Sequence, residues 1–501
     1  MPKGRAAGVA AGGSYAGGMT NSTTDRRRRG GACPGVALLV VILLLAWPAA
    51  AVVHATAGEP PAEDDPSHVI EMREALALPG GVRAGGRSPL QQDLIEHQRV
   101  LGNWAPPEKG DTVESLDGET LTWTTMAAND DGWIADSSLR GGYVSWTVEL
   151  DEARIMLLEA AGHSVVHVNG VPRGGDPYGY GWALLPVALN EGGNELLFAV
   201  SRGRVRAKLI EPNASAVFRP SEATLPDLII GEPWAVRGSV LVVNAEREAR
   251  EAGELAIRAG GGELPVYESS LPRIESLTQR KVAFTFGGAV DPEIDRIDLP
   301  IVLIERGPDG VERVLDRTTL RVRVRQPHEK HKRTFISDID GSVQYYAVTP
   351  PPQGEAGGAL VLTLHGASVE AMNQANAYGR KDWAHIVAPT NRRPFGFDWE
   401  DWGRIDAMEV LSESMERFEP DPRQIYLTGH SMGGHGTWHL GATFPCQWAA
   451  IGPSAGWISF RSYGGAPDWT GTPLADVHLP SDTLALLENY LRHGVYILHG
   501  E

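Results

Sequence analysis

Cysteine and positive charge are both scarce in this chain. Its 501 residues include two cysteines, which excludes the small secreted folds that replace a hydrophobic core with disulfides. Cys33 falls in the N-terminal leader, so we expect Cys446 to be a lone, buried structural thiol in the mature chain. Lys and Arg number 45 against 63 Asp and Glu, which gives a net charge of −18. Because a protein needs a basic face to bind a nucleic-acid backbone, we expect no nucleic-acid partner.

The N-terminal segment has the pattern of an export signal. A basic run from Arg26 to Arg29 precedes an apolar run from Val36 to Trp47, and Ala55-Thr56-Ala57 offers a small-x-small cleavage site. The pattern predicts a signal peptide over residues 1–57 and an exported protein, either periplasmic, on the cell surface or extracellular. Pro48 interrupts the apolar run, which is short for a membrane span. A membrane is therefore expected as a partner only if the leader stays uncleaved.

Two β-rich units are predicted after a short linker. Residues 58–88 are rich in Pro, Gly, Glu and Asp and are predicted as the linker, with one helical patch from Ile70 to Leu76. Short strand patterns separated by turn residues run through 89–218, where Asn169-Gly170 is a strong hairpin signal. A second such unit covers 219–328. Each is expected to be an all-β sandwich, the second of the immunoglobulin-like type.

The first of these units carries a short resemblance to a known fold. The stretches Val166 to Pro172 and Leu189 to Leu196 resemble the strand-Asn-Gly and Leu-x-x-Gly-x-Asn signature of galactose-binding-like jelly rolls. Those are accessory domains of many glycosidases, so the resemblance implies that carbohydrate could be a partner of this unit. The loop from Asp176 to Trp182 has the aromatic content of a sugar-stacking loop. The alternative is that these rings cover one end of the sandwich.

From residue 329 onward, apolar strand patterns alternate with helical ones. Ala359 to Leu364 has the pattern of a buried strand, and Ile405 to Phe418 that of an amphipathic helix. Such alternation predicts an α/β domain with a mostly parallel sheet. The expected fold class is therefore multidomain, with two N-terminal sandwiches followed by an α/β domain. The expected parts are a signal peptide (1–57), a linker (58–88), a jelly-roll-like sandwich (89–218), an immunoglobulin-like sandwich (219–328) and the α/β domain (329–501).

The most informative motif is Gly429-His430-Ser431-Met432-Gly433, which reads Gly-x-Ser-x-Gly. An apolar strand pattern precedes it and a helical pattern follows it. A serine on such a strand-to-helix turn is a nucleophile whose Oγ is exposed to substrate. The backbone N–H of Met432 is then expected in the oxyanion hole. The second donor should come from the loop after the third strand, where Ala367 is preferred and Ser368 is the alternative.

Several other titratable residues are expected to be structural. His435 and His439 fall four apart on the helix after Ser431, but no Glu completes a His-Glu-x-x-His zinc motif. His365 is expected to shape its loop, and His430 to line the site.

Three acids, Asp398, Asp401 and Asp406, cluster before the helix that starts near residue 405. They precede the serine in the chain, so we interpret them as a solvated loop with helix-capping acids.

The last third of the chain resembles the catalytic domain of prolyl-oligopeptidase-type serine hydrolases and their esterase relatives. The resemblance rests on Leu364 to Ala367, Asp421 to Trp438 and the terminal Leu498-His499-Gly500. It implies an enzyme, either a serine-type peptidase or a carboxylic ester hydrolase, that cleaves peptide or ester bonds through an acyl-serine. It also implies that no metal or cofactor is needed.

In this superfamily an acidic residue and then a histidine follow the serine. The chain to residue 501 holds neither at the expected place, so we expect an incomplete hydrolase domain. Residues 1–501 alone are not expected to react with a fluorophosphonate. The alternative hypothesis is a non-catalytic carbohydrate- or surface-binding protein with a relict hydrolase domain, which would bind sugar without labelling of Ser431.

Overall fold

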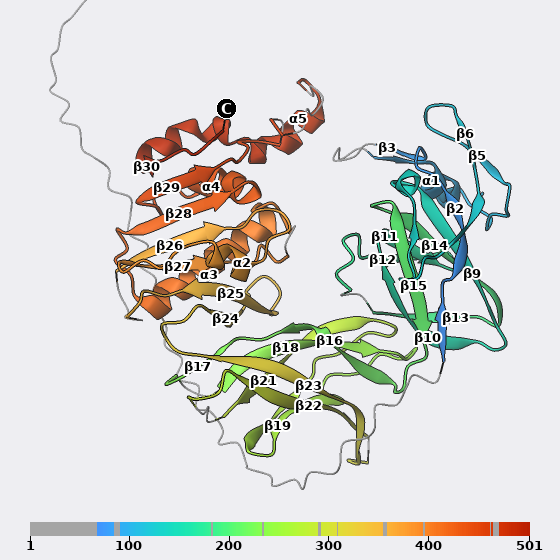
Figure 1. Ribbon diagram of the computed structural model, residues 1–501, viewed down its shortest axis with the longest axis horizontal. Coiled ribbons are helices and arrows are strands. Elements are labelled where there is room, and N and C mark those ends of the chain that lie inside the picture. The colour runs from blue at the N-terminus through green and yellow to red at the C-terminus, as the bar shows by residue number, and fades with distance from the viewer. Residues whose placement is uncertain are drawn as a thin grey trace, which may run out of the picture. The chain divides into compact units, whose positions relative to one another are not determined.

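The computed structural model in Figure 1 describes the chain from residue 68 to residue 500 with short gaps. The predicted signal peptide and the first part of the predicted linker lie outside the described residues. Within the described ranges, no helix has both the length and the apolar character needed to cross a bilayer. The described ranges are 68–84, 91–181, 184–232, 235–288, 292–307, 309–353, 358–393, 396–460, 462–463 and 470–500.

Residues 69–210 form two large antiparallel sheets and two small two-stranded ones, β3-β4 and β5-β6. One core cluster takes buried side chains from both large sheets, among them Leu158 and Phe198. The first sheet has the order β1-β15-β10-β13, with β8 added to β15. Its strands are β1 (Val69–Glu71), β8 (Ile134–Ala135), β10 (Arg154–Ala161), β13 (Leu185–Leu189) and β15 (Arg204–Ile210). The second has the order β12-β11-β14-β9-β2-β7, formed by β2 (Glu74–Leu78), β7 (Thr124–Ala127), β9 (Tyr143–Leu150), β11 (His163–Val168), β12 (Val171–Gly174) and β14 (Gly192–Val200).

Smaller elements accompany these two sheets. They are β3 (Arg83–Ala84), β4 (Gln92–Asp93), β5 (Thr112–Glu114), β6 (Thr120–Thr122), the helix α1 (Leu94–Val100) and the 3-10 turn η1 (Ser137–Leu139).

The prediction of a linker over 58–88 is wrong for the residues described there. Strands β1 and β2 fall inside it, and the predicted helical patch from Ile70 to Leu76 does not form. Glu, Ala and Leu favour helix by propensity, but β2 is paired on both sides, by β7 and β9. Pairing and burial in the sheet override the local preference.

The hairpin prediction at Asn169-Gly170 is confirmed. These two residues join β11 to β12 and have φ values of 47° and 88°, which a tight two-residue turn requires. The buried Asn194 accepts a hydrogen bond from the Asn169 side chain at 2.7 Å and from the backbone N–H of Asn190 at 2.8 Å. The two halves of the Asn-Gly and Gly-x-Asn pattern are thus joined by hydrogen bonds.

Residues 216–325 form two further sheets around a second core cluster. The strand Glu312–Arg325 (β23) buries Leu320, Val322 and Val324, as its alternation predicts. Arg323, on the other face, makes two hydrogen bonds to the buried Asp227. One sheet holds β16 (Ala216–Thr224), β18 (Ala235–Asn244) and β21 (Gln279–Gly287), and the other β17 (Leu228–Ile229), β19 (Leu255–Gly261), β20 (Leu264–Ser270), β22 (Arg296–Arg306) and β23.

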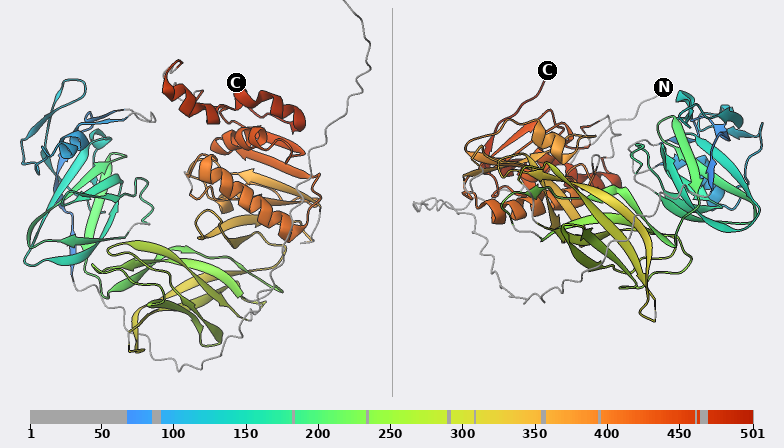
Figure 2. Two further views of the ribbon diagram at one scale, coloured as in Figure 1. Left: turned by 180° about the vertical axis from the view of Figure 1, so that it is seen from behind. Right: turned by 60° about the horizontal axis from the view of Figure 1, so that its bottom comes forward.

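The last part of the chain forms a seven-stranded sheet of order β24-β25-β27-β26-β28-β29-β30. In this order, β27, β26, β28 and β29 each run parallel to the next strand, up to β30. Strand β25 is antiparallel to both of its neighbours, β24 and β27. Figure 2 gives two further views of this sheet and its helices. The strands are β24 (His331–Ile336), β25 (Val343–Thr349), β26 (Ala359–Leu364), β27 (Ala384–Ala388), β28 (Ile425–His430), β29 (Ala450–Ser454) and β30 (Gly494–Val495).

Helices α2, α3 and α4 pack against this sheet. The helix predicted from Ile405 to Phe418 is confirmed, although α3 starts four residues earlier, and its Leu411 and Phe418 enter the third core cluster. Cys446 is exposed, so the expectation of a buried thiol is wrong. The helices are α2 (Ala371–Asn376), α3 (Asp401–Phe418), α4 (Met432–Thr443) and α5 (Pro473–His478), with 3-10 turns η2 (Leu479–Ser481) and η3 (Thr483–Arg492).

Candidate active site

Ser431 lies at the turn between β28, a central parallel strand, and α4. Its φ of 57° and ψ of −117° are sparsely populated for a residue with a side chain, which costs on the order of 1–3 kcal/mol. The backbone N–H of Ser431 donates to the carbonyl oxygen of Ser454 at 2.9 Å, and its carbonyl accepts from the N–H of His435 at 3.1 Å. This is the backbone geometry expected of a serine on a tight strand-to-helix turn.

The glycines of the motif are required by close backbone contacts. A Cβ at Gly433 would lie 2.0 Å from the carbonyl oxygen of Leu364, at the end of β26. A Cβ at Gly429 would lie 2.3 Å from the carbonyl oxygen of Gly433. Side chains are therefore excluded at both positions, and the start of α4 can pack directly on the end of β26.

The loop after β26 passes beside the serine. We call residues His365–Ser368 the donor loop. A Cβ at Gly366 would lie 3.6 Å from the Cβ of Ser431, and the N–H of Val369 donates to the carbonyl of Gly366 at 3.2 Å. Ala367 and Ser368 are both exposed on this loop, and Ser368 has a left-handed φ of 66°.

Met432 is the first residue of α4 and its side chain is buried. The first N–H groups of a helix have no partner within the helix, and the N–H of Met432 is one of these groups in α4. The structure therefore brings together the elbow that carries Ser431 and Met432 and the loop that carries Ala367 and Ser368.

His365 is fully buried and holds the donor loop in place. Its Nδ1 lies 2.9 Å from the carbonyl oxygen of Gly366, and its Nε2 lies 2.9 Å from that of Thr390. Burial lowers the pKa of His365. With both ring nitrogens facing backbone oxygens, His365 shapes the loop, as predicted, and is not placed to accept a proton from Ser431.

Both histidines of α4 are buried. His435 is fully buried, with Nδ1 3.0 Å from the carbonyl oxygen of Trp457 and Nε2 2.9 Å from Oε1 of Glu400. His439 is also buried, and burial lowers its pKa to about 4. His430, next to the serine, is exposed, and its Nδ1 lies 3.1 Å from the hydroxyl oxygen of Ser454.

The segment between β27 and α3 contains residues that sequence reasoning missed. Trp399 is fully buried, and its indole Nε1 donates to the carbonyl of His365 at 3.0 Å. Asn391, Asp398 and Trp399 have left-handed φ values of 53°, 52° and 67°. The side-chain oxygen of Asn391 accepts from the N–H groups of Phe397 and Trp399, which supports this backbone. The available signal was a long loop at the carboxyl end of a parallel strand, a place where sites gather.

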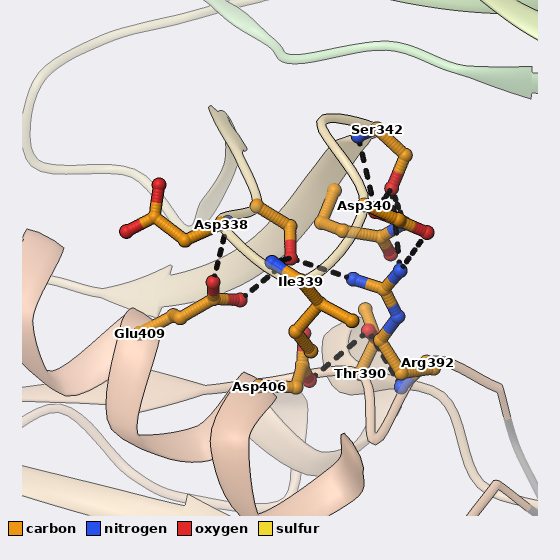
Figure 3. A network of polar contacts seen from close by, with 10 residues as sticks. Asp338, Ile339, Asp340, Ser342, Thr390, Arg392, Asp406 and Glu409 are labelled. Carbon is orange, nitrogen blue, oxygen red and sulfur yellow. Dashed lines mark hydrogen bonds and ion pairs between the residues drawn. The ribbon is translucent and has the colours of Figure 1, made fainter.

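A polar network anchors the start of that segment (Figure 3). The Arg392 guanidinium donates to the hydroxyl of Ser337 at 2.9 Å and to the carboxylate of Asp340 at 2.6 Å. Glu409 of α3 accepts from the Ser337 hydroxyl at 2.8 Å and from the Asp338 N–H at 2.6 Å. The loop from 390 to 392 is thereby tied to α3 and to the turn between β24 and β25.

The interpretation of the three acids before α3 as solvated is wrong for Asp406. Its side chain is fully buried one turn into α3, where one carboxylate oxygen lies 3.4 Å from the Thr390 hydroxyl. Burial raises the pKa of Asp406 to about 7. Asp401 is exposed at the start of the helix, as expected. Helical periodicity places Asp406 on the same face of α3 as Val410, toward the core. A role in capping the helix does not predict this burial.

Within the described residues, no group of three or more His, Cys, Asp or Glu side chains is arranged to hold a metal ion.

Comparisons with known proteins give weak relatives. No family model matches the chain. An uncharacterized secreted protein of Arthroderma benhamiae is 25% identical over 226 residues, which cover 40% of this chain and 23% of that protein. The chain therefore spans less than a quarter of the length of this curated relative.

Several solved structures of hydrolases are similar to part of the chain. An S-formylglutathione hydrolase from Staphylococcus aureus has 14% identity and a TM-score of 0.28, covering 34% of this chain and 80% of its own. One from Agrobacterium tumefaciens has 20% identity and a TM-score of 0.24, covering 32% and 68%. A thermostable esterase has 15% identity and a TM-score of 0.24, covering 57% and 91%. Scores this low carry no argument about function, which has to come from the site.

Proposed function

We propose that this protein is an exported serine hydrolase that cleaves peptide or ester bonds through an acyl-Ser431 intermediate. The observation that carries the proposal is the backbone of Ser431, held at φ 57° and ψ −117° at the end of a central parallel strand. Strain of this kind persists where the surrounding structure enforces it, and it gathers at functional sites. The secreted relative from Arthroderma benhamiae supports export.

In the proposed reaction, the Oγ of Ser431 attacks the substrate carbonyl carbon and loses its proton to a general base. The oxygen of the tetrahedral intermediate accepts hydrogen bonds from the N–H of Met432 and from that of Ala367, with Ser368 as the alternative. The leaving amine or alcohol takes the proton, and water then releases the acyl group. His365 and His435 are fully engaged elsewhere, so the base is neither of them.

The test uses the gene expressed to its own stop codon. A fluorophosphonate should label the wild-type protein, and Ser431→Ala should abolish labelling and turnover. Ser412→Ala, an exposed serine on α3, is the matched control and should leave both unchanged. Peptide p-nitroanilides and p-nitrophenyl esters then separate a prolyl-oligopeptidase-type peptidase from an esterase. A folded wild-type protein that takes no label would contradict the proposal.

A second candidate function, carbohydrate binding, is favoured by the loop after β12. Three successive N–H groups, those of Gly179, Tyr180 and Gly181, donate to the carboxylate of the buried Asp176. The loop so fixed exposes the rings of Tyr178 and Tyr180, whose centroids are 5.9 Å apart. We propose that these rings stack on a sugar. If a glycan binds and Ser431 takes no label, the chain is a binding protein with a relict hydrolase domain.

A further inference from the structure

Two backbone donors of the proposed oxyanion hole come from segments far apart in sequence. Met432 begins α4, whereas Ala367 and Ser368 belong to the donor loop after β26. Stabilising an oxyanion requires both donors to point at one position, so the two segments need a fixed relative arrangement. Three residues of the chain between β27 and α3 contact these segments: Thr390 contacts the donor loop, Glu400 contacts α4, and Trp399 contacts both. We call these residues, Thr390, Trp399 and Glu400, the brace.

The brace contacts the donor loop twice, each time at His365. The carbonyl oxygen of Thr390 lies 2.9 Å from its Nε2, and the Nε1 of Trp399 donates to its carbonyl oxygen at 3.0 Å. The rings of His365 and Trp399 also meet edge to face, with centroids 4.9 Å apart. His365 is two residues from Ala367, and both its ring and its carbonyl are engaged by the brace.

Glu400 and Trp399 contact α4 on the other side. Glu400 meets the Nε2 of His435, one turn after Ser431, at 2.9 Å. A Cβ at Gly436 would lie 2.5 Å from the Cβ of Trp399, so the helix backbone packs directly on that side chain. Trp399 and His435 are both fully buried. The left-handed backbone at Trp399, with φ of 67°, is a further sign that the structure enforces this placement.

We infer that Trp399 and Glu400 are positioning residues of the proposed hydrolase site. They hold the donor loop and the start of α4 in the arrangement that lets the N–H of Met432 and that of Ala367 meet one oxyanion. The inference rests on the proposed function. Misplacing a reacting or stabilising group by about 1 Å costs on the order of 100-fold in rate, so loss of a brace contact should lower kcat more than it raises KM.

The experiment compares Trp399→Phe, which removes the indole N–H and keeps an aromatic ring, with Trp402→Phe on an exposed tryptophan three residues later. Fluorophosphonate titration counts intact sites, so that kcat is expressed for each titrated serine. We expect Trp399→Phe to lower this kcat about 10- to 100-fold with KM changed less than about threefold. Trp402→Phe should stay within about twofold of wild type.

Two further measurements separate positioning from a loss of folded protein. Glu400→Ala should lower kcat in the same way, and Glu400→Gln should restore most of it, because an amide can still bond to His435. Hydrogen exchange over 364–370 and 429–436 should be faster in Trp399→Phe than in Trp402→Phe. If the wild-type enzyme is labelled and its Trp399→Phe and Glu400→Ala variants keep the same kcat, the inference is wrong but the proposed function stands. Absence of label on wild type would overturn the proposed function as well.

Discussion

Ser431 and Ser454 are joined through their backbones, with the N–H of Ser431 donating to the carbonyl oxygen of Ser454 at 2.9 Å. This bond continues the parallel pairing of β28 with β29, in which His430 pairs with Ser454. The elbow is therefore held by the sheet itself, independently of any substrate. A site fixed in this way needs little reorganisation when charge develops on a substrate oxygen.

Replacing Gly433 should damage the α/β domain. A Cβ there would lie 2.0 Å from the carbonyl oxygen of Leu364, and backbone atoms at the end of β26 cannot move aside easily. We expect Gly433→Ala to destabilise the domain by about 1–3 kcal/mol or more, seen as a lower Tm. Gly379→Ala is the matched control, because a Cβ at Gly379 meets nothing within 4 Å. Equal Tm values for the two variants would contradict this account of the elbow.

The strand, the elbow and the helix after it were predictable because they are local. Residues 424–440 combine an apolar run, the Gly-x-Ser-x-Gly turn and a helical pattern, and β28 and α4 form there. The strands β1 and β2 were missed because they form by pairing with β15, β7 and β9, and every one of these pairings joins residues more than 45 positions apart. No local pattern reports such long-range pairing.

The brace was missed for a related reason. Trp399 lies in a polar stretch that contains Pro and Gly, a composition typical of an exposed loop. It is buried because His365 and Gly436, which precede and follow it in the sequence, meet in space at its side chain. Asp406 was misjudged because a helix-capping role accounted for its position in sequence, whereas its burial depends on how α3 packs on the sheet.

The loop around Asp176 should lose its order when the carboxylate is removed. Three N–H groups donate to this side chain, and Asp176→Ala leaves them without that acceptor. We expect a loss of about 1–3 kcal/mol and faster hydrogen exchange over 176–181, because three hydrogen bonds to one side chain are lost together. Any glycan affinity of the loop should fall with it. Asp130 is an exposed acid in another loop of the same two sheets, and Asp130→Ala should change neither the stability nor the glycan affinity.

Arg392 should not be replaceable by lysine. Its guanidinium bonds to the Ser337 hydroxyl and to the Asp340 carboxylate at once, and its side chain is 8% exposed. A lysine ammonium is a compact charge that does not reproduce this fork. We expect Arg392→Lys to lower stability by about 1–2 kcal/mol, measured as a shift in urea unfolding. Arg393→Lys, at the exposed neighbouring position, should be neutral, and equal effects at both positions would contradict the network in Figure 3.

The buried Asp406 should make the stability of the α/β domain depend on pH. Burial raises its pKa to about 7 from an ordinary value of 3.8, so the folded state favours the protonated carboxyl. Its contribution to stability is complete below about pH 4 and is lost as pH rises through about 7. The difference between the two pKa values corresponds to about 4 kcal/mol.

Asp406→Asn removes this titration, so the variant should lose about 4 kcal/mol less stability than wild type between pH 4 and pH 8. The comparison is made by urea unfolding at several pH values, with Asp382→Asn as a control at an exposed acid. Arg392, whose charge favours ionised Asp406, and Glu409, whose charge opposes it, are present in all three proteins. Parallel pH profiles for wild type and Asp406→Asn would show that Asp406 is ionised in the folded protein throughout this range, contrary to its burial.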